Sequence, residues 1–162
     1  MEFQLTHPYQ AGIGRVLEAF FDKDHILEKN TLLGARNARV AELEKSDASA
    51  KLLVERQMTS STEVPGMLAS FHREWNQIKQ EEHWFRKSDG EWHCEFRVHI
   101  EGVPAKIKGM MKLEGTKEAC TNHLTLNVRC DVPLLGKKIA AFLANDCSVK
   151  IDREYEIIQQ ML

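Results

Sequence analysis

A proline-led stretch, Val132-Pro133-Leu134-Leu135-Gly136-Lys137-Lys138-Ile139, decides the fold because it begins a helix that we predict to run to Leu162. Proline lacks a backbone N–H donor, so it ends the extended segment before it. At a period of 3.6 residues, one face of this helix is apolar and carries Ile139, Leu143, Cys147, Ile151, Ile158 and Leu162. The opposite face carries Asn145, Ser148, Asp152, Glu156 and Gln159. This pattern is typical of a helix that lies on a β-sheet, so the middle of the chain is expected to supply the sheet.

One acidic residue interrupts the apolar face of this helix. Glu154 projects close to its centre, and Lys150 lies one turn earlier, near its edge. A carboxylate in apolar surroundings needs a charged or hydrogen-bonding partner, or a cavity that holds water. Glu154 is therefore a candidate functional residue.

The composition is that of an ordinary globular chain. With 162 residues, 43% hydrophobic content, 28% charged content and a net charge of -2, a single domain over residues 1–162 is expected, and bulk charge favours no nucleic acid partner. No apolar run reaches the roughly 18 residues of a membrane span, and the first residues lack the basic start and apolar core of a signal peptide. The sequence therefore predicts a cytoplasmic protein without integral membrane association. No paired ligand spacing links the cysteines, which are expected to be buried, reduced thiols: Cys94, Cys120, Cys130 and Cys147.

The N-terminal part of the chain mixes both periodicities. Apolar residues alternate with polar ones up to Pro8, where a short first strand is expected to end. Helical spacing over residues 13–21, and again from residue 25 towards Gly34, predicts two short helices. From residue 35 the period changes to two, which predicts a hairpin whose second strand directs inward Ala50, Leu52, Val54 and Met58.

Arg56 shares the parity of these inward residues. Its side chain either reaches water at the sheet edge, as long cationic side chains often do, or belongs to an interior site. Residues 59–73 follow without alternation, and we interpret them either as a lid over a binding site or as a connector that covers the end of the core.

Four further strands complete the predicted sheet. In residues 75–86 apolar side chains fall on both parities, which predicts a β-bulge. Between residues 92 and 132 alternation is clear, and three strands direct inward Trp92, Cys94, Phe96, Val98, Ile100, Ala105, Ile107, Gly109, Met111, Leu113, Cys120, Leu124, Leu126, Val128, Cys130 and Val132. If the turns are tight, Phe96, Gly109 and Leu124 are cross-strand neighbours. An aromatic ring that covers the glycine is then more common than a hollow at this position.

The predicted order is a strand, two short helices, six strands with a long segment after the third strand, and a long helix. Together with the stretch from Val132 to Ile139, Trp92 in the strand that leads to Gly102-Val103-Pro104, and Glu154 before the C-terminus, this order resembles the START-like (SRPBCC, helix-grip) superfamily. More narrowly, it resembles a bacterial domain-of-unknown-function family within that superfamily. The resemblance implies an α+β fold in which a curved, antiparallel, seven-stranded sheet surrounds the C-terminal helix and leaves an apolar cavity between them.

Other kinds of site find little support in the sequence. His93, His99 and His123 fall on outward faces, where they lack the surrounding carboxylates and carbonyls of metal ligands, so no metal is expected. The basic residues of the outward face alternate with glutamates and lack exposed aromatic neighbours, which favours a solvated face over a nucleic-acid or membrane surface; they are Arg97, Lys106, Lys108 and Lys112. No GxSxG motif, cysteine–histidine–acid set or glycine-rich phosphate loop occurs. No catalytic residue and no cofactor is therefore assigned.

The candidate site lies in the cavity that the resemblance implies, and its residues are Arg56, Trp92, Phe96, Met111, Asn122, Leu126, Phe142 and Glu154. A mostly apolar pocket with a few polar groups is typical of small-molecule sites. We predict a carrier or sensor of a hydrophobic small molecule or lipid, monomeric or homodimeric, in which Arg56 binds any acidic head group and residues 64–71 gate access.

Three alternatives remain open at this point. Arg56 and Glu154 form a purely structural ion pair, or Glu154 serves as acid or base in a cyclase- or hydrolase-type enzyme. In the third alternative, the outward sheet face belongs to a chaperone-type interaction module.

Overall fold

Seven antiparallel strands form one sheet in the computed structural model, which describes residues 1–71 and 73–162, and their order is β1-β7-β6-β5-β4-β3-β2. The elements along the chain are β1 (Glu2–Tyr9), α1 (Ile13–Phe21), α2 (Lys23–Leu32), β2 (Arg36–Lys45), β3 (Ser49–Met58), the short 3-10 helix η1 (Gly66–Phe71), β4 (Asn76–Arg86), β5 (Trp92–Ile100), β6 (Lys106–Gly115), β7 (Cys120–Arg129) and α3 (Gly136–Met161). The predicted seven-stranded sheet, two short helices and long C-terminal helix are confirmed.

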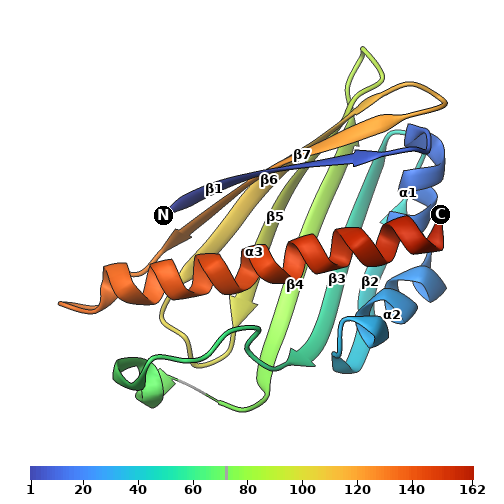
Figure 1. Cartoon of the computed structure of the whole chain (residues 1–162). Coiled ribbons are helices and arrows are strands. Elements are labelled where there is room, and N and C mark those ends of the chain that lie inside the picture. Colours follow the sequence, from blue (N-terminus) through green and yellow to red (C-terminus); the bar gives the residue numbers. More distant parts are fainter. Residues whose placement is uncertain (72) are drawn as a thin grey trace.

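The long helix α3 lies across the curved sheet, as Figure 1 shows, with α1 and α2 near its C-terminal half and η1 near its N-terminal half. The predicted apolar face of α3 is turned inward, with Ile139, Leu143 and Ile158 buried. Ser148, which we expected on the outer face, is buried as well. The concave sheet and the segment before η1 contact α3 on more than one side, so the buried face is wider than the apolar stripe.

The first strand differs from its prediction at Pro8. β1 continues through this residue to Tyr9, and Pro8 pairs with Thr121 on β7. Proline is tolerated here because β1 is an edge strand, on which an N–H facing away from the sheet needs no partner. As a consequence His7 and Tyr9 are buried on the inward face.

The predicted bulge in the fourth strand is wrong. β4 pairs with β3 without interruption from Asn76 to Phe85, and Trp75 precedes the strand. Its inward positions are the even ones, but Gln80 and Glu82 stand there between two apolar residues and hide the alternation. The mixed parity that suggested a bulge therefore comes from two polar residues on the concave face, Gln80 and Glu82.

Two helix boundaries place α2 against the sheet and α3. Asp22 begins the helix, and its side chain accepts a hydrogen bond from the His25 backbone N–H at 3.0 Å. Gly34 follows its end with φ +87, a left-handed conformation that favours glycine. The helix held between these residues buries Lys29 and Asn30.

The cross-strand neighbours of Gly109 are Phe96 and Leu126, so the predicted pairing with Leu124 is one inward position off. Gly115 pairs with Cys120 across the four-residue β6–β7 turn, and this pairing sets the register. A Cβ at Gly109 would lie 2.3 Å from Phe96 Cζ, so the ring covers the glycine. This position therefore belongs to a filled part of the core, as the sequence indicates.

Candidate ligand-binding cavity

A cavity of about 100 Å³ lies between the sheet and α3. Its apolar lining includes Phe20, Leu33, Ile78, Trp84, Phe96, Val98, Ile100, Met111, Leu124, Leu126, Ile151 and Ile158. Six of the eight predicted site residues line it, namely Arg56, Phe96, Met111, Asn122, Leu126 and Glu154. Most of the side chains proposed from sequence are thus brought to one space.

Trp92 and Phe142 lie outside this cavity. Trp92 is buried, and its ring packs against that of Phe21 with a centroid distance of 6.0 Å. Phe142 lies near the other end of α3 and lines a second cavity of about 40 Å³ with Leu68 and Phe71 from η1. Periodicity assigned Trp92 to the inward face but could not tell a packed position from one that borders an open space, and Phe142 was predicted only as part of the cavity.

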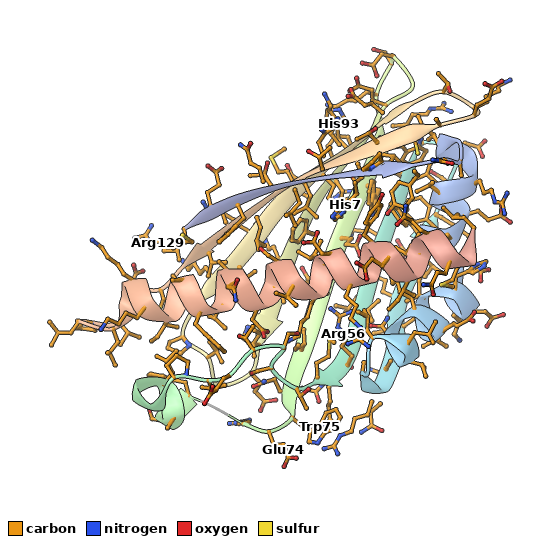
Figure 2. The ribbon with its side chains drawn as sticks, viewed as in Figure 1. His7, Arg56, Glu74, Trp75, His93 and Arg129 are labelled. Atoms are coloured by element: carbon orange, nitrogen blue, oxygen red, sulfur yellow. The ribbon has the colours of Figure 1, made fainter. Side chains whose placement is uncertain are left out.

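Arg56 is buried, with 8% of its surface exposed, so the interpretation as an edge arginine in water is wrong. Its guanidinium donates to Asn30 Oδ1 at 2.6 Å and to Gln80 Oε1 at 3.0 Å. Its Nε–H has no hydrogen-bond partner within residues 1–71 and 73–162. Figure 2 shows Arg56 on β3 and His7 on β1 on either side of α3.

Glu154 forms its ion pair with Lys29, whose Nζ lies 2.7 Å from Glu154 Oε1. The alternative of an ion pair between Arg56 and Glu154 is therefore wrong, because α2 inserts a lysine at this point and the hydrogen bonds of Arg56 go to neutral amides. Burial opposes the charge of Glu154, but Lys29 and Arg56 hold its pKa below the usual range. A carboxyl group with a lowered pKa is ionised at neutral pH, which does not suit the general acid role that we considered.

Glu82 is the carboxyl group with the opposite behaviour. Burial raises its pKa, the positive charge of Lys29 opposes the rise, and the negative charge of Glu154 adds to it. Trp84 Nε1 donates to Glu82 Oε1 at 3.0 Å, and Gln80 Nε2 donates to Glu82 Oε2 at 3.2 Å. A continuous polar network therefore runs along the cavity wall through Asn30, Arg56, Gln80, Glu82 and Trp84.

At the β1 side of the cavity, His7 and Asp152 form a pair with 2.8 Å between Nε2 and Oδ1. The ring of His7 stacks on Tyr155, with 4.2 Å between centroids and 7° between planes. The Tyr155 hydroxyl donates to the carbonyl of Pro8. Tyr9 also lines the cavity, and its burial raises the pKa of its hydroxyl, so the group stays protonated.

A second ion pair separates the two cavities, since both are lined by Asp146 and Lys150. Lys150 Nζ lies 2.6 Å from Asp146 Oδ2, and Asp146 Oδ1 accepts a hydrogen bond from the Ser61 backbone N–H. Asp146 therefore ties the segment before η1 to α3. Lys150 lies one turn before Glu154, as the sequence indicates, but it pairs with Asp146, which lies one turn before Lys150.

The polar residues that the sequence analysis missed are His7, Tyr9, Lys29, Gln80, Glu82, Asp146 and Tyr155. His7 could have been found, since it shares the parity of Phe3 and Leu5. Gln80 and Glu82 share the parity of Ile78 and Trp84. Lys29 carries no such signal, because α2 does not separate apolar and polar residues onto two faces and the position of Lys29 depends on how the helix packs.

The outward sheet face is of mixed charge, as expected. Arg97 pairs across strands with Glu81 on one side and Lys108 on the other. His93 and His123 lie here beside Glu91 and Glu114, respectively. Among the described residues, no group of three or more histidines, cysteines or acidic residues is placed to hold a metal ion.

The helices of the described chain include none that is long and apolar enough to cross a membrane. The cysteines are free; Cys94 and Cys120 are buried, whereas Cys130 and Cys147 are partly exposed. Burial raises the pKa of the Cys147 thiol to about 11.

Solved structures define the class of fold. The Zhui aromatase/cyclase from Streptomyces sp. R1128 superposes with a TM-score of 0.65 at 10% identity, covering 99% of this chain and 92% of that one. A START superfamily protein from Mycobacterium smegmatis superposes with a TM-score of 0.54 at 8% identity, covering 99% of both chains. At such low identity these similarities show the fold alone, which is the START-like helix-grip fold.

The sequence defines the family. The chain belongs to the family described as protein of unknown function (DUF2505), whose model matches residues 4–162. The uncharacterized protein Rv0481c of Mycobacterium tuberculosis is 24% identical over 155 residues, which cover 90% of this chain and 87% of that protein. The predicted resemblance to a domain-of-unknown-function family is confirmed, as is the predicted START-like fold.

Proposed function

We propose that the chain binds a small, largely apolar molecule in the cavity between the sheet and α3, as a carrier or a sensor. The observation that supports this proposal is the cavity itself, a space of about 100 Å³ with apolar walls and a few polar groups.

The volume limits the size of the ligand. An apolar cavity of about 150 Å³ binds benzene. The present cavity, of about 100 Å³, is smaller, so a single aromatic ring or a compact aliphatic group is the largest apolar group that suits it. We accordingly favour a small ring compound over a lipid with a long acyl chain, which was the other ligand class predicted from sequence.

Titration with toluene, followed by two-dimensional ¹H–¹⁵N NMR, tests the proposal. We expect saturable shifts of backbone amides at cavity positions such as Val98 and Met111. In Ile151→Trp the larger side chain fills the cavity from α3, so these shifts should disappear.

The matched control is Val149→Trp, which places the same side chain on the same helix at a position with 41% exposure. This variant should bind toluene as the wild type does. The proposal fails if the wild type shows no saturable shifts, or if Ile151→Trp keeps them while its circular dichroism shows a native fold. The cytoplasmic location and the monomeric or homodimeric state stay predictions.

A further inference from the structure

Arg56, in the wall of the cavity, has a buried hydrogen-bond donor without a partner. The residue is 92% buried and lines the cavity, and its Nε–H has no partner in the described structure. A buried donor without an acceptor costs free energy, which a ligand that supplies the acceptor recovers. The free energy gained is larger when the acceptor is charged, because guanidinium groups form short, strong bonds with carboxylates.

The charges around the cavity leave Arg56 without a direct counter-ion. Apart from His7, which pairs with Asp152 outside the lining, the described lining residues include three basic and three acidic ones: Lys29, Arg56, Lys150, Glu82, Asp146 and Glu154. Four of them form two direct pairs, Lys29 with Glu154 at 2.7 Å and Lys150 with Asp146 at 2.6 Å. Arg56 and Glu82 remain, and the neutral amide of Gln80 stands between them.

We infer that the cavity selects a small, largely apolar molecule with a single carboxylate, which accepts a hydrogen bond from Arg56 Nε while Glu82 takes up a proton from solvent. This inference rests on the proposed function and specifies its ligand class. One anion and one proton enter together, so the net charge of the cavity is unchanged. A dianionic phosphate monoester does not meet this balance, because one guanidinium and one proton-accepting carboxylate are the groups left unpaired.

Proton uptake follows from the surroundings of Glu82. The charged and titratable groups around it are Lys29 on α2, Arg56 on β3, Cys94 on β5 and Glu154 on α3. Burial already raises the pKa of Glu82. A ligand carboxylate at Arg56 adds negative charge at the far end of the Gln80 bridge and raises this pKa further.

Benzoate and its neutral isostere benzamide provide the test, each titrated into the wild type by NMR. We expect benzoate to bind at least about tenfold more tightly, as a charge-assisted hydrogen bond in a buried site allows. In Arg56→Met this preference should fall to about twofold or less, and in Lys79→Met it should persist. Lys79 is the matched control because it lies on β4 with 56% of its side chain exposed, outside the cavity.

A second readout does not depend on the Arg56 variant being folded. Calorimetry of benzoate binding to the wild type, in buffers with different ionisation enthalpies, should show net proton uptake. Benzamide should show none, and Glu82→Gln should bind benzoate without uptake.

The outcomes separate the two proposals. If benzamide and toluene bind as tightly as benzoate, or if benzoate binds without proton uptake, this inference is wrong and the proposed function stands. If none of the three compounds binds, the proposed function is wrong.

Discussion

Two regions of the same concave sheet face differ in how they are filled. The first, the aromatic end, is a cluster of rings that pack with centroid distances of 5.6 to 6.2 Å and comprises Tyr9, Phe20, Phe21, Trp84 and Trp92. Tyr9, Phe20 and Trp84 also border the cavity, whereas Phe21 and Trp92 lie outside it. The second, the polar wall, consists of Lys29, Arg56, Gln80, Glu82 and Glu154, which border the cavity. Trp84 and Glu82 stand two residues apart on β4; Trp84 borders the cavity and also packs on Phe20 and Phe21, so the packed and the open region meet at this strand.

The difference shows that an inward position on a sheet is not necessarily a packed one. Rings fill space on their own and need only offset or edge contacts with each other. Buried charged groups need hydrogen bonds and counter-ions in fixed directions. The side chains that satisfy these groups do not fill all of the space around the charges. The helix-grip fold therefore combines a rigid end with a region that is open to a ligand.

The largest expected effect is at the aromatic end. Trp92→Ala should lower the free energy of unfolding by about 3–5 kcal/mol, because it removes a large buried ring and leaves a cavity. Urea denaturation followed by circular dichroism measures the loss. Met111→Ala, which removes apolar atoms from the border of the existing cavity, should cost less. Equal losses would contradict the contrast between a packed end and an open wall.

The next effect is at the ion pair of the polar wall. Lys29→Met should cost about 2–3 kcal/mol near pH 7, because it leaves Glu154 without its counter-ion in a partly buried place. The loss should shrink towards pH 4, where Glu154 without Lys29 takes up a proton. In the wild type the lowered pKa of Glu154 contributes stability above the ordinary value of 4.5, and this contribution disappears as pH falls through the lowered pKa.

The double variant Lys29→Met with Glu154→Leu is the control for this pair. Replacing both charges by apolar side chains of similar size should recover most of the loss. Urea denaturation of the two variants at pH 7 and pH 4 makes the comparison. A double variant as unstable as Lys29→Met would show that the lysine acts through packing rather than charge.

The sequence predicts the architecture well but the polar wall only in part. Strict alternation in residues 92–132 and the apolar stripe of α3 depend on local periodicity, so the sheet and its covering helix follow from the chain alone. Arg56 and Glu154 were found because each interrupts an apolar pattern. Lys29 was not, because its contact with Glu154 depends on the packing of two helices that are far apart in sequence. Gln80 and Glu82 were missed because a regular strand with two polar residues at inward positions is easily mistaken for an irregular strand.

A smaller effect is expected at the boundary between the two cavities. Asp146→Asn should cost about 1–2 kcal/mol, because the amide can still accept from Ser61 N–H but no longer neutralises Lys150. Thermal unfolding measures the loss, and Asp152→Asn on the same helix, with 57% of the Asp152 side chain exposed, is the control. If Asp146→Asn is neutral, the Lys150 pair does not hold this boundary.

The smallest effect has the opposite sign and lies at Glu82. Its pKa is raised in the folded protein above the ordinary value of 4.5, so the folded state holds a proton that the unfolded state has released. Stability should therefore fall as pH rises from 4.5 towards the raised pKa. Glu82→Gln keeps a donor and an acceptor but cannot ionise, so it should be more stable than the wild type at pH 7 and equal to it near pH 4. Urea denaturation across this range measures the difference, and a wild type that is the more stable at pH 7 would show that the ionised form of Glu82 is favoured inside the polar wall.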